Sequence, residues 1–401
     1  MSHDHAHAGH ALRDAMRMPP KAWTLPLAAV GIAVGAGSYA LDHHRFWFSF
    51  LTAFLFLMSI SLGGLVFVVI QHLVRARWSV VVRRQAEHLM MNIRFLALLA
   101  IPLFAFGMEH LYHHWMHPGD DPILAKKLEY LNPQMFTART ALYFLVWLLL
   151  SWYFYSRSVR QDTDGNLDHT RGMQKVSTVG AFLVALSLSF AAFDWIMSLD
   201  PHWFSTMFGV YYLAGCFIAI HTSLIVVVAC LRERGWLTHT ISTEHDHDLG
   251  KLSFGFTIFW AYIAYSQFML IWYANLPEET YWYAKRWDGS WWILSLALLF
   301  GRFFAPFFFL MSRHVKRRAF LLKLAAVWML TFQYLDVYWL VMPSYEAGEG
   351  HDHVMAVAVD MLCLVGFGLA FLALFVRRQS TTDLVPTQDP RLAESLCFTN
   401  G

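Results

Sequence analysis

Charged side chains and cysteine are both scarce in this sequence. Only 14% of the 401 residues are charged, whereas 57% are apolar and 17% are aromatic. A soluble globular chain of this composition would leave large apolar patches in water, so the soluble class is excluded. The formal net charge of +2 is close to neutral and indicates no particular class of partner.

The four cysteines form no motif for a haem or a cluster. Three of them lie within apolar runs, and the sequence contains neither CxxC nor CxxCH. Covalent c-type haem and iron–sulfur clusters are therefore not expected, and no cofactor is assigned to this chain. The sequence also lacks a Walker A loop, a dinucleotide fingerprint, a nucleophile elbow and any nucleic-acid-binding pattern. These absences argue against a free-standing hydrolase, an ATP-driven pump and a nucleic-acid partner. No catalytic residue is predicted.

Residues 1–22 form a polar, histidine-rich tail that is predicted to be cytoplasmic. Residues 1–18 lack the apolar core and the small-residue cleavage site of a signal peptide, so the first apolar helix is expected to act as an uncleaved insertion signal. Histidine tracts occur in this tail and in two later segments: His3, His5, His7, His10, His245, His247, His351 and His353. Tracts that alternate His with Asp are usually solvated, so no metal site is predicted in them.

Ten apolar runs of about 19–29 residues predict an all-α integral membrane protein with about ten transmembrane helices. They fall near residues 23–41, 46–72, 90–112, 137–155, 176–199, 203–231, 252–276, 290–311, 320–342 and 354–376. The chain therefore divides into the tail 1–22, a single ten-helix membrane domain 23–376 and a cytoplasmic C-terminal tail 377–401.

The distribution of Lys and Arg predicts the orientation of these helices. Of the 30 Lys and Arg residues, 22 fall in segments that are cytoplasmic when the N-terminus is inside, and six fall in the opposite segments. Because cytoplasmic loops are enriched in positive charge, both termini are expected in the cytoplasm. Arg302 lies in the middle of an apolar run, near the start of the string GRFFAPFFF at 301–309. A cation at that depth is expected to need a carboxylate or an anionic ligand.

Two parts of the sequence resemble each other faintly. The second helix opens with Trp-Phe-Ser at 47–49, and the sixth opens with Trp-Phe-Ser at 203–205. Asp194 in the fifth helix and Asp336 in the ninth lie at similar predicted depths. This repeat predicts two four-helix bundles, formed by helices 2–5 and 6–9, with helices 1 and 10 at their flanks. The alternative is that aromatic residues and arginine pairs recur at membrane interfaces without duplication.

Nine polar residues within or beside the apolar runs are candidates for a proton path, because carboxylates and imidazoles can gain and lose a proton. The candidates are Asp194, Asp336, Glu109, His110, His221, Arg302, Asp360, Asp200 and His202. Each has a structural alternative. Asp194 and Asp336 can lie shallow enough to be hydrated, or can pair permanently with Arg302 or with each other's Tyr and Trp neighbours. Asp360 can face water, and His221 can be a hydrogen-bonded packing residue.

The turn between the fifth and sixth helices carries the most specific motif. Asp200 is expected to cap the sixth helix, with Pro201 at its first position and Ser205 or Thr206 as the competing cap. Residues 193–211 read FDWIMSLDPHWFSTMFGVY. This segment resembles the signature segment of the NrfD-like integral membrane subunits of alternative complex III, a bacterial quinol:cytochrome c or electron-acceptor oxidoreductase. The ten-helix layout and the length are similar to the ActF type rather than to the longer ActC type.

The resemblance implies a cofactor-free accessory subunit in the bacterial inner membrane. Its implied partners are a multihaem cytochrome c subunit, an iron–sulfur subunit, an ActC-type NrfD-like paralogue, lipids and a terminal oxidase. Haem c and the iron–sulfur clusters would lie in partner subunits, and quinone would bind elsewhere in the complex. The chain would contribute structure and part of a proton-conducting path, for which the resemblance makes six of the nine residues candidates: Asp194, Asp336, Glu109, His110, His221 and Arg302.

Two other functions remain compatible with the sequence. A quinone could bind between the helices of the first bundle, where His110, Asp194 and His202 would contact the quinol hydroxyls. The chain could instead be an independent ion or solute permease. Many transporters have broken helices in corresponding halves, whereas Pro306 in the eighth helix has no counterpart in the fourth.

Overall fold

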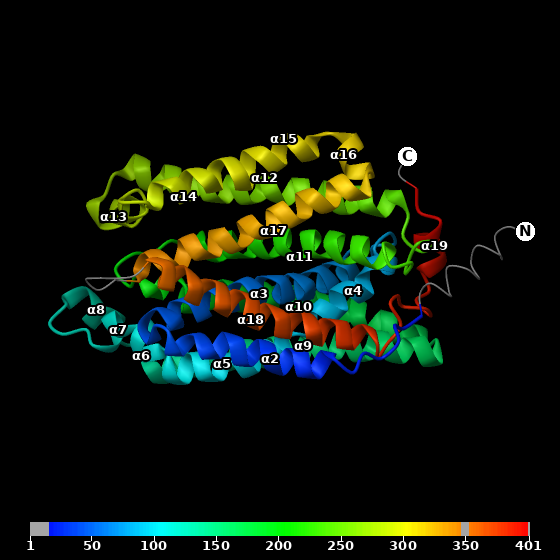
Figure 1. Cartoon of the computed structure of the whole chain (residues 1–401), viewed down its shortest axis with the longest axis horizontal. Coiled ribbons are helices and arrows are strands. Elements are labelled where there is room, and N and C mark those ends of the chain that lie inside the picture. The colour runs from blue at the N-terminus through cyan, green and yellow to red at the C-terminus, as the bar shows by residue number, and fades with distance from the viewer. Residues whose placement is uncertain (1–15, 346–352, 400–401) are drawn as a thin grey trace, which may run out of the picture.

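The computed structural model of the chain describes residues 16–345 and 353–399, so the histidines at positions 3–10 and His351 lie outside the described residues. Within these ranges, nine helices are long and apolar enough to cross a membrane, and the shorter apolar segment Thr24–Ala40 precedes them. The long helices lie side by side along the longest axis of the molecule (Figure 1). The prediction of an all-α integral membrane protein with about ten helices is confirmed.

Several of the spans are interrupted. In chain order the membrane helices are α2 (Thr24–Gly37), α3 (His43–Leu73), α4 (Val80–Met90), α5 (Ile93–Phe106), α9 (Pro133–Asp164), α10 (Leu167–Trp195), α11 (Phe208–Arg232), α12 (Thr243–Ala274), α14 (Trp291–Ala297), the π-helical turn η3 (Leu298–Phe304), α15 (Ala305–Met311), α17 (Ala319–Val341) and α18 (His353–Gln379). The short helices are α6 (Met108–Leu111), α7 (His113–Met116), α8 (Pro122–Lys127), α13 (Pro277–Lys285), α16 (Arg313–Arg317) and α19 (Leu392–Leu396).

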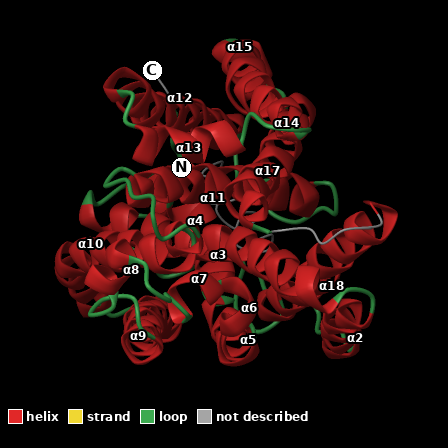
Figure 2. Ribbon diagram, turned by 90° about the vertical axis from the view of Figure 1, so that its left-hand side faces the viewer, coloured by secondary structure: helices red, strands yellow, loops and turns green. Residues whose placement is uncertain are grey.

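The spans form two four-helix bundles. In the first, α3 packs against α4 and α10, while α9 packs against α5 and α10. In the second, α11 packs against α12 and α17, and the span made of α14, η3 and α15 also packs against α12 and α17. The bundles meet where α11 contacts α3 and α10, and α3 lies near the centre of the molecule in Figure 2. This arrangement confirms the predicted bundles of helices 2–5 and 6–9.

The two flanking helices, α2 and α18, pack closely on each other. A Cβ atom at Gly366 of α18 would lie 2.4 Å from the backbone nitrogen of Gly35, and one at Gly31 would lie 2.6 Å from the Gly366 carbonyl oxygen. Small residues allow membrane helices to approach until their backbones touch. Because α18 also packs against α3, the flanking pair is attached to the centre of the molecule.

The two ends of the bundle differ in what covers them. At one end, called the tail end, the Met18 N–H donates to the Gln379 carbonyl at 3.1 Å. Residues 380–399 fold against this end, where Arg83 donates to the Asp389 carboxylate at 2.5 Å. At the other end, called the distal end, lie α6, α7, α8 and α13 (Figure 1). The C-terminal segment is therefore packed onto the first bundle.

The third predicted helix begins earlier in the chain than we expected from the sequence, and buried charged residues at the tail end explain the difference. The third helix was expected to start near residue 90, but α4 begins at Val80. Arg83 and Arg84 thus fall inside the helix and are buried. Glu87, one turn further on, accepts ion pairs from both of them at 3.3 and 3.0 Å. Because these arginines are paired with Glu87, they can be buried within the span, whereas unpaired arginines would mark the membrane boundary.

The turn between α10 and α11 also differs from the expectation. Asp200 does not cap α11, which begins at Phe208 without a side-chain cap. Trp203 is only 2% exposed and stacks on Trp282 of α13, with ring centroids 4.2 Å apart. Burial of this indole holds the segment before Phe208 in a non-helical turn, so α11 starts later than predicted.

Candidate functional site

The nine predicted residues do not form one continuous path. Three of them, Asp194, Asp336 and Asp360, are buried in membrane spans, and each is paired with an arginine from another helix. Unpaired carboxylates in a membrane interior are costly, so these pairs account for the presence of all three. The pairs differ in how tightly the carboxylate is held.

Asp194, on the last turn of α10, is completely buried and firmly held. From α9, Arg139 donates through Nε to Oδ2 at 2.8 Å and through Nη2 to Oδ1 at 2.9 Å. Tyr143, one turn further along α9, donates its hydroxyl to Oδ2 at 2.7 Å. Both carboxylate oxygens therefore accept charge-assisted hydrogen bonds in a bidentate arrangement, which is the geometry of a structural clamp.

Asp360 is held in a similar way between α18 and α3. Arg45 donates through Nε to Oδ1 at 3.1 Å and through Nη2 to Oδ2 at 2.7 Å. Ser49 and Tyr338 donate their hydroxyls to the same carboxylate at 2.5 and 3.1 Å. Asp360 is 3% exposed, so the alternative that it faces water is wrong. The ion pair between Arg45 and Asp360 connects α18, the last membrane helix, to the central helix α3.

Asp336, in α17 of the second bundle, is held less tightly. Tyr211 of α11 donates its hydroxyl to Oδ1 at 2.5 Å, and Arg302 Nη2 lies 3.2 Å from Oδ2. The shorter hydrogen bonds of Arg302 go to Gln333 Oε1 at 2.7 Å and to the Phe332 carbonyl at 3.0 Å. The predicted need of Arg302 for a carboxylate is met, but most of its hydrogen bonds are made elsewhere.

An unusual backbone holds Arg302 in this position. The residue lies in the π-helical turn η3, which precedes Pro306. Proline has no backbone N–H, and π-helical turns often occur at functional sites. A Cβ at Gly301 would lie 2.0 Å from the Phe332 ring, so the backbone approaches α17 closely here. The guanidinium lies over the Trp260 ring at 4.4 Å, which places Arg302 between α12 and α17.

A groove of about 710 Å³ lies between α12 and the span formed by α14 and η3. Its walls are mostly aromatic and aliphatic, and exposed side chains such as Tyr265 and Leu299 open it to the outside of the bundle. Polar groups that line it include Tyr211, Gln267 and Tyr283. Since Tyr211 also donates to Asp336, the buried carboxylate is one hydrogen bond away from the groove.

The distal end of this groove is close to a buried cation. Arg286 is 1% exposed, and among the described residues no carboxylate oxygen lies within 4 Å of its guanidinium. It donates instead to the carbonyls of Trp282, Trp339 and Leu340. Burial lowers the pKa of Arg286 below its ordinary value, with the more distant Asp200 acting in the opposite direction. Trp339 also lines the groove, so the positive charge lies directly behind one of its walls.

On the side towards the tail end, the hydrogen-bonded chain from Asp336 stops. Gln333 Nε2 donates to Ser59 of α3 at 3.4 Å, and Ser59 donates to a carbonyl of its own helix. His221 is not part of this chain. Its Nδ1 is bonded to the Phe217 carbonyl at 2.7 Å, and its ring packs against aromatic rings of α3 and α12. The structure therefore shows His221 in the arrangement expected of a packing residue.

The remaining four candidates lie on the distal loops with separate partners. His202 Nε2 is 2.6 Å from Asp121, and this contact lowers the pKa of Asp121. Tyr281 donates to Asp200 at 2.5 Å. His110 stacks on an indole of α3, and Glu109 belongs to a histidine cluster. A quinone site formed by His110, Asp194 and His202 would use residues that already have other partners. Both oxygens of Asp194 already accept hydrogen bonds from Arg139.

Sequence reasoning missed the partners of the buried aspartates. Arg45 and Arg139 were assigned to outer segments, although both lie inside helices near the distal end. The spacing of Arg139 and Tyr143, four residues apart on one helix face, was a signal that could have identified a carboxylate clamp. A second missed feature is the buried tail-end network, in which Arg84 Nη2 lies 2.6 Å from Asp162.

Comparison with known protein families finds no family that matches this chain, and no characterised protein sequence matches it either.

Proposed function

We propose that this chain is a membrane subunit of a quinol-oxidising respiratory complex of the alternative complex III type, and that its second bundle carries the distal half of a proton path. The resemblance of residues 193–211 and the two-bundle architecture support the subunit assignment. The excess of Lys and Arg supports a cytoplasmic tail end in a bacterial inner membrane. Haem c, iron–sulfur clusters and the main quinone site are then expected in partner subunits.

One observation carries the proton-path proposal: of the three buried aspartates described in the membrane spans, Asp336 accepts the fewest hydrogen bonds from its arginine, and its other hydrogen-bond partner, Tyr211, lines the groove. Asp194 and Asp360 each accept two hydrogen bonds from an arginine. Asp336 has one longer arginine contact, at 3.2 Å, and a bond from Tyr211. A carboxylate must lose stabilising contacts before it can accept a proton, so fewer contacts make protonation less costly.

The arrangement also suggests how such a path would be gated. While Arg302 stays near Asp336, its positive charge favours the ionised carboxylate. Arg302 already donates to Gln333 and to the Phe332 carbonyl, so a small movement towards these acceptors would weaken its contact with Asp336. Proton uptake through Tyr211 would then follow the position of Arg302. Coupling to electron transfer would require a partner subunit to shift this equilibrium.

The test compares Asp336→Asn with Asp194→Asn in the intact purified complex. We expect Asp336→Asn to lower proton release per electron transferred while the complex remains assembled. Asp194→Asn is the matched control, because it removes one charge of a buried pair in the other bundle. Unchanged proton release with Asp336→Asn would remove the second bundle from the path. Purification of the chain without any cytochrome or iron–sulfur partner would refute the subunit assignment itself.

The groove favours a second candidate function, the binding of a quinone by this chain in the second bundle. Its apolar walls suit a prenyl chain, and Gln267 and Tyr283 are hydrogen-bonded to each other at 3.2 Å where they could contact a head group. A photoreactive quinone analogue should then label α12 or the α14–η3 span, and Gln267→Leu should reduce the labelling. Labelling confined to a sister subunit would refute this candidate.

A further inference from the structure

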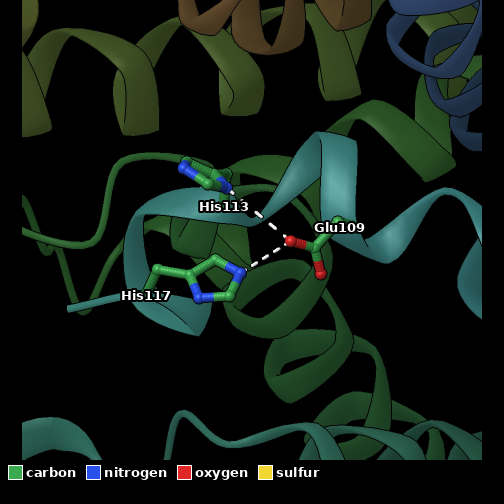
Figure 3. Close-up of side chains that lie close together, drawn as sticks. All are labelled: Glu109, His113 and His117. Carbon is green, nitrogen blue, oxygen red and sulfur yellow. Dashed lines mark hydrogen bonds and ion pairs between the residues drawn. The ribbon is translucent and has the colours of Figure 1, made fainter.

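A compact cluster of two histidines and a glutamate lies on the distal loop formed by α6 and α7. Glu109, His113 and His117 are spaced four residues apart and project to the same side of the loop (Figure 3). Their side chains are 53%, 67% and 57% exposed. Glu109 Oε1 lies 2.6 Å from His117 Nε2 and 3.8 Å from His113 Nδ1.

The backbone beneath these side chains is fixed by buried neighbours. Tyr112, 1% exposed, donates its hydroxyl to the Trp195 carbonyl at 2.9 Å. Trp115, 2% exposed, packs against Phe136 of α9 with ring centroids 5.7 Å apart. Met108 and other residues on the inner side of the loop are also buried. The three exposed side chains are therefore displayed from a loop whose opposite side is packed on the first bundle.

The three ligand atoms are close enough to share one metal ion. The Glu109 oxygen and the two imidazole nitrogens all lie within 4.8 Å of one another. Bonds of about 2.0–2.1 Å to a tetrahedral Zn²⁺ place neighbouring ligand atoms about 3.4 Å apart. The observed separations of 2.6 and 3.8 Å lie on either side of that value, so side-chain rotations alone would complete the geometry.

The electrostatics of the cluster agree with this chemistry. No Lys or Arg side chain among the described residues forms an ion pair with Glu109, whose recorded partners are the two histidines. Ionised carboxylate and imidazole are the ligand types of zinc sites with two histidines and one glutamate.

We propose that Glu109, His113 and His117 form a binding site for a divalent transition-metal ion of the zinc class. Three protein ligands leave at least one coordination position open to water or to a partner's side chain. A bound ion would join α6 to α7 across the turn at Tyr112 and would stiffen the distal surface of the first bundle. The site is independent of the proposed proton path, which lies in the second bundle.

The test is isothermal titration of the purified full-length chain with ZnCl₂. His113→Ala and His117→Ala are each expected to weaken the tightest binding event by at least about tenfold, since even outer-shell changes cost 10–100-fold at metal sites. His114→Ala is the matched control, because it removes a neighbouring exposed histidine outside the cluster and should leave this event unchanged. All three variants change exposed side chains, so folding should be unaffected.

A second readout separates the cluster from the histidine-rich N-terminal tail. Co²⁺ added to the wild-type chain should give the visible absorption of a tetrahedral site, and Glu109→Gln should alter that spectrum. Identical titrations of the wild type, His113→Ala and His117→Ala would refute the site. Equal weakening by His114→Ala would also refute it, because the ion would then be held by a diffuse set of surface histidines.

Discussion

The clamp between Asp194 and Arg139 should contribute measurably to the stability of the first bundle. Replacing Asp194 by Asn removes the negative charge but keeps the side-chain volume, and it leaves the Arg139 guanidinium without its carboxylate. An amide has one acceptor oxygen, so the variant keeps at most one of the two Arg139 hydrogen bonds, of 2.8 and 2.9 Å, and the bond from Tyr143 no longer reaches an ionised carboxylate. We therefore expect lower stability even though the fold is retained.

The magnitude follows from the burial of the pair. Breaking a buried ion pair by removing one partner costs about 3–5 kcal/mol. Arg139 is 18% exposed and also lies over the Tyr130 ring at 3.8 Å, so part of its charge remains stabilised in the variant. We expect a loss at the lower end, about 3 kcal/mol, for Asp194→Asn and a similar loss for Arg139→Gln. The double variant should lose clearly less than the sum, because its two neutral amides can bond to each other.

The assay is a double-mutant cycle on the purified chain, with reversible unfolding followed in mixed detergent micelles. A coupling energy of about 2–3 kcal/mol is expected for two groups in direct contact. Tyr143→Phe serves as the control for the loss of a single hydrogen bond, with an expected cost of about 1–2 kcal/mol. If the single variants each lose less than about 1 kcal/mol and their losses add, Asp194 is hydrated and the clamp does not stabilise the bundle.

Two further predictions concern the flanking helices and the tail end. Gly366→Leu should destabilise the chain by about 1–3 kcal/mol, because the new side chain would overlap the α2 backbone. Gly368→Leu is the control and should have little effect, because a Cβ at Gly368 would have open space around it. Thermal unfolding of the two variants measures the difference. For Asp389, burial raises the pKa, but the charge and hydrogen bond of Arg83 together with the Arg391 N–H and His72 lower it, and the folded-state pKa is below its ordinary value. The stabilisation is present above about pH 4 and is lost as the pH falls further. The hydrogen-exchange protection of residues 380–399, measured relative to the intrinsic rate at each pH, should therefore fall below about pH 4, and Asp389→Asn should lower this protection at pH 7 as well.

Much of the fold could be predicted because the information is local. A membrane span must satisfy its backbone hydrogen bonds internally, so a long apolar run almost determines a helix. The bundles of helices 2–5 and 6–9 followed from a short repeated motif at 47–49 and 203–205. The start of α4 did not follow, because Arg83 and Arg84 look like a membrane boundary until their buried partners are known.

The site was less predictable because it depends on distances between helices. The need of Arg302 for a carboxylate could be inferred from its depth, and Asp336 supplies it. The partner of Asp194 was not predicted: Arg139 lies at the outer end of the predicted helix 137–155, and its spacing from Tyr143 indicates a clamp without showing which carboxylate occupies it. The cluster of Glu109, His113 and His117 was also not predicted from the sequence. Their spacing indicates a cluster only once the arrangement of α6 and α7 is known, because that arrangement places the three side chains on one side of the loop.

Each bundle contains its own Asp–Arg pair, and the two pairs lie on corresponding helices. One neighbouring side chain accounts for much of the difference in how the two arginines distribute their hydrogen bonds. Asp194 and Asp336 occupy helices 5 and 9 of the repeat, and their arginines come from helices 4 and 8. Three residues before Asp336, Gln333 accepts the shortest hydrogen bond of Arg302, whereas Ala191 occupies the corresponding position before Asp194 and offers no side-chain acceptor. The second bundle therefore divides its arginine between Asp336 and Gln333, whereas Arg139 gives two hydrogen bonds to Asp194 and a third to the Tyr130 carbonyl at 2.9 Å. A pair that can be divided in this way can have two arrangements of similar energy, which a gated proton path requires and a structural clamp does not.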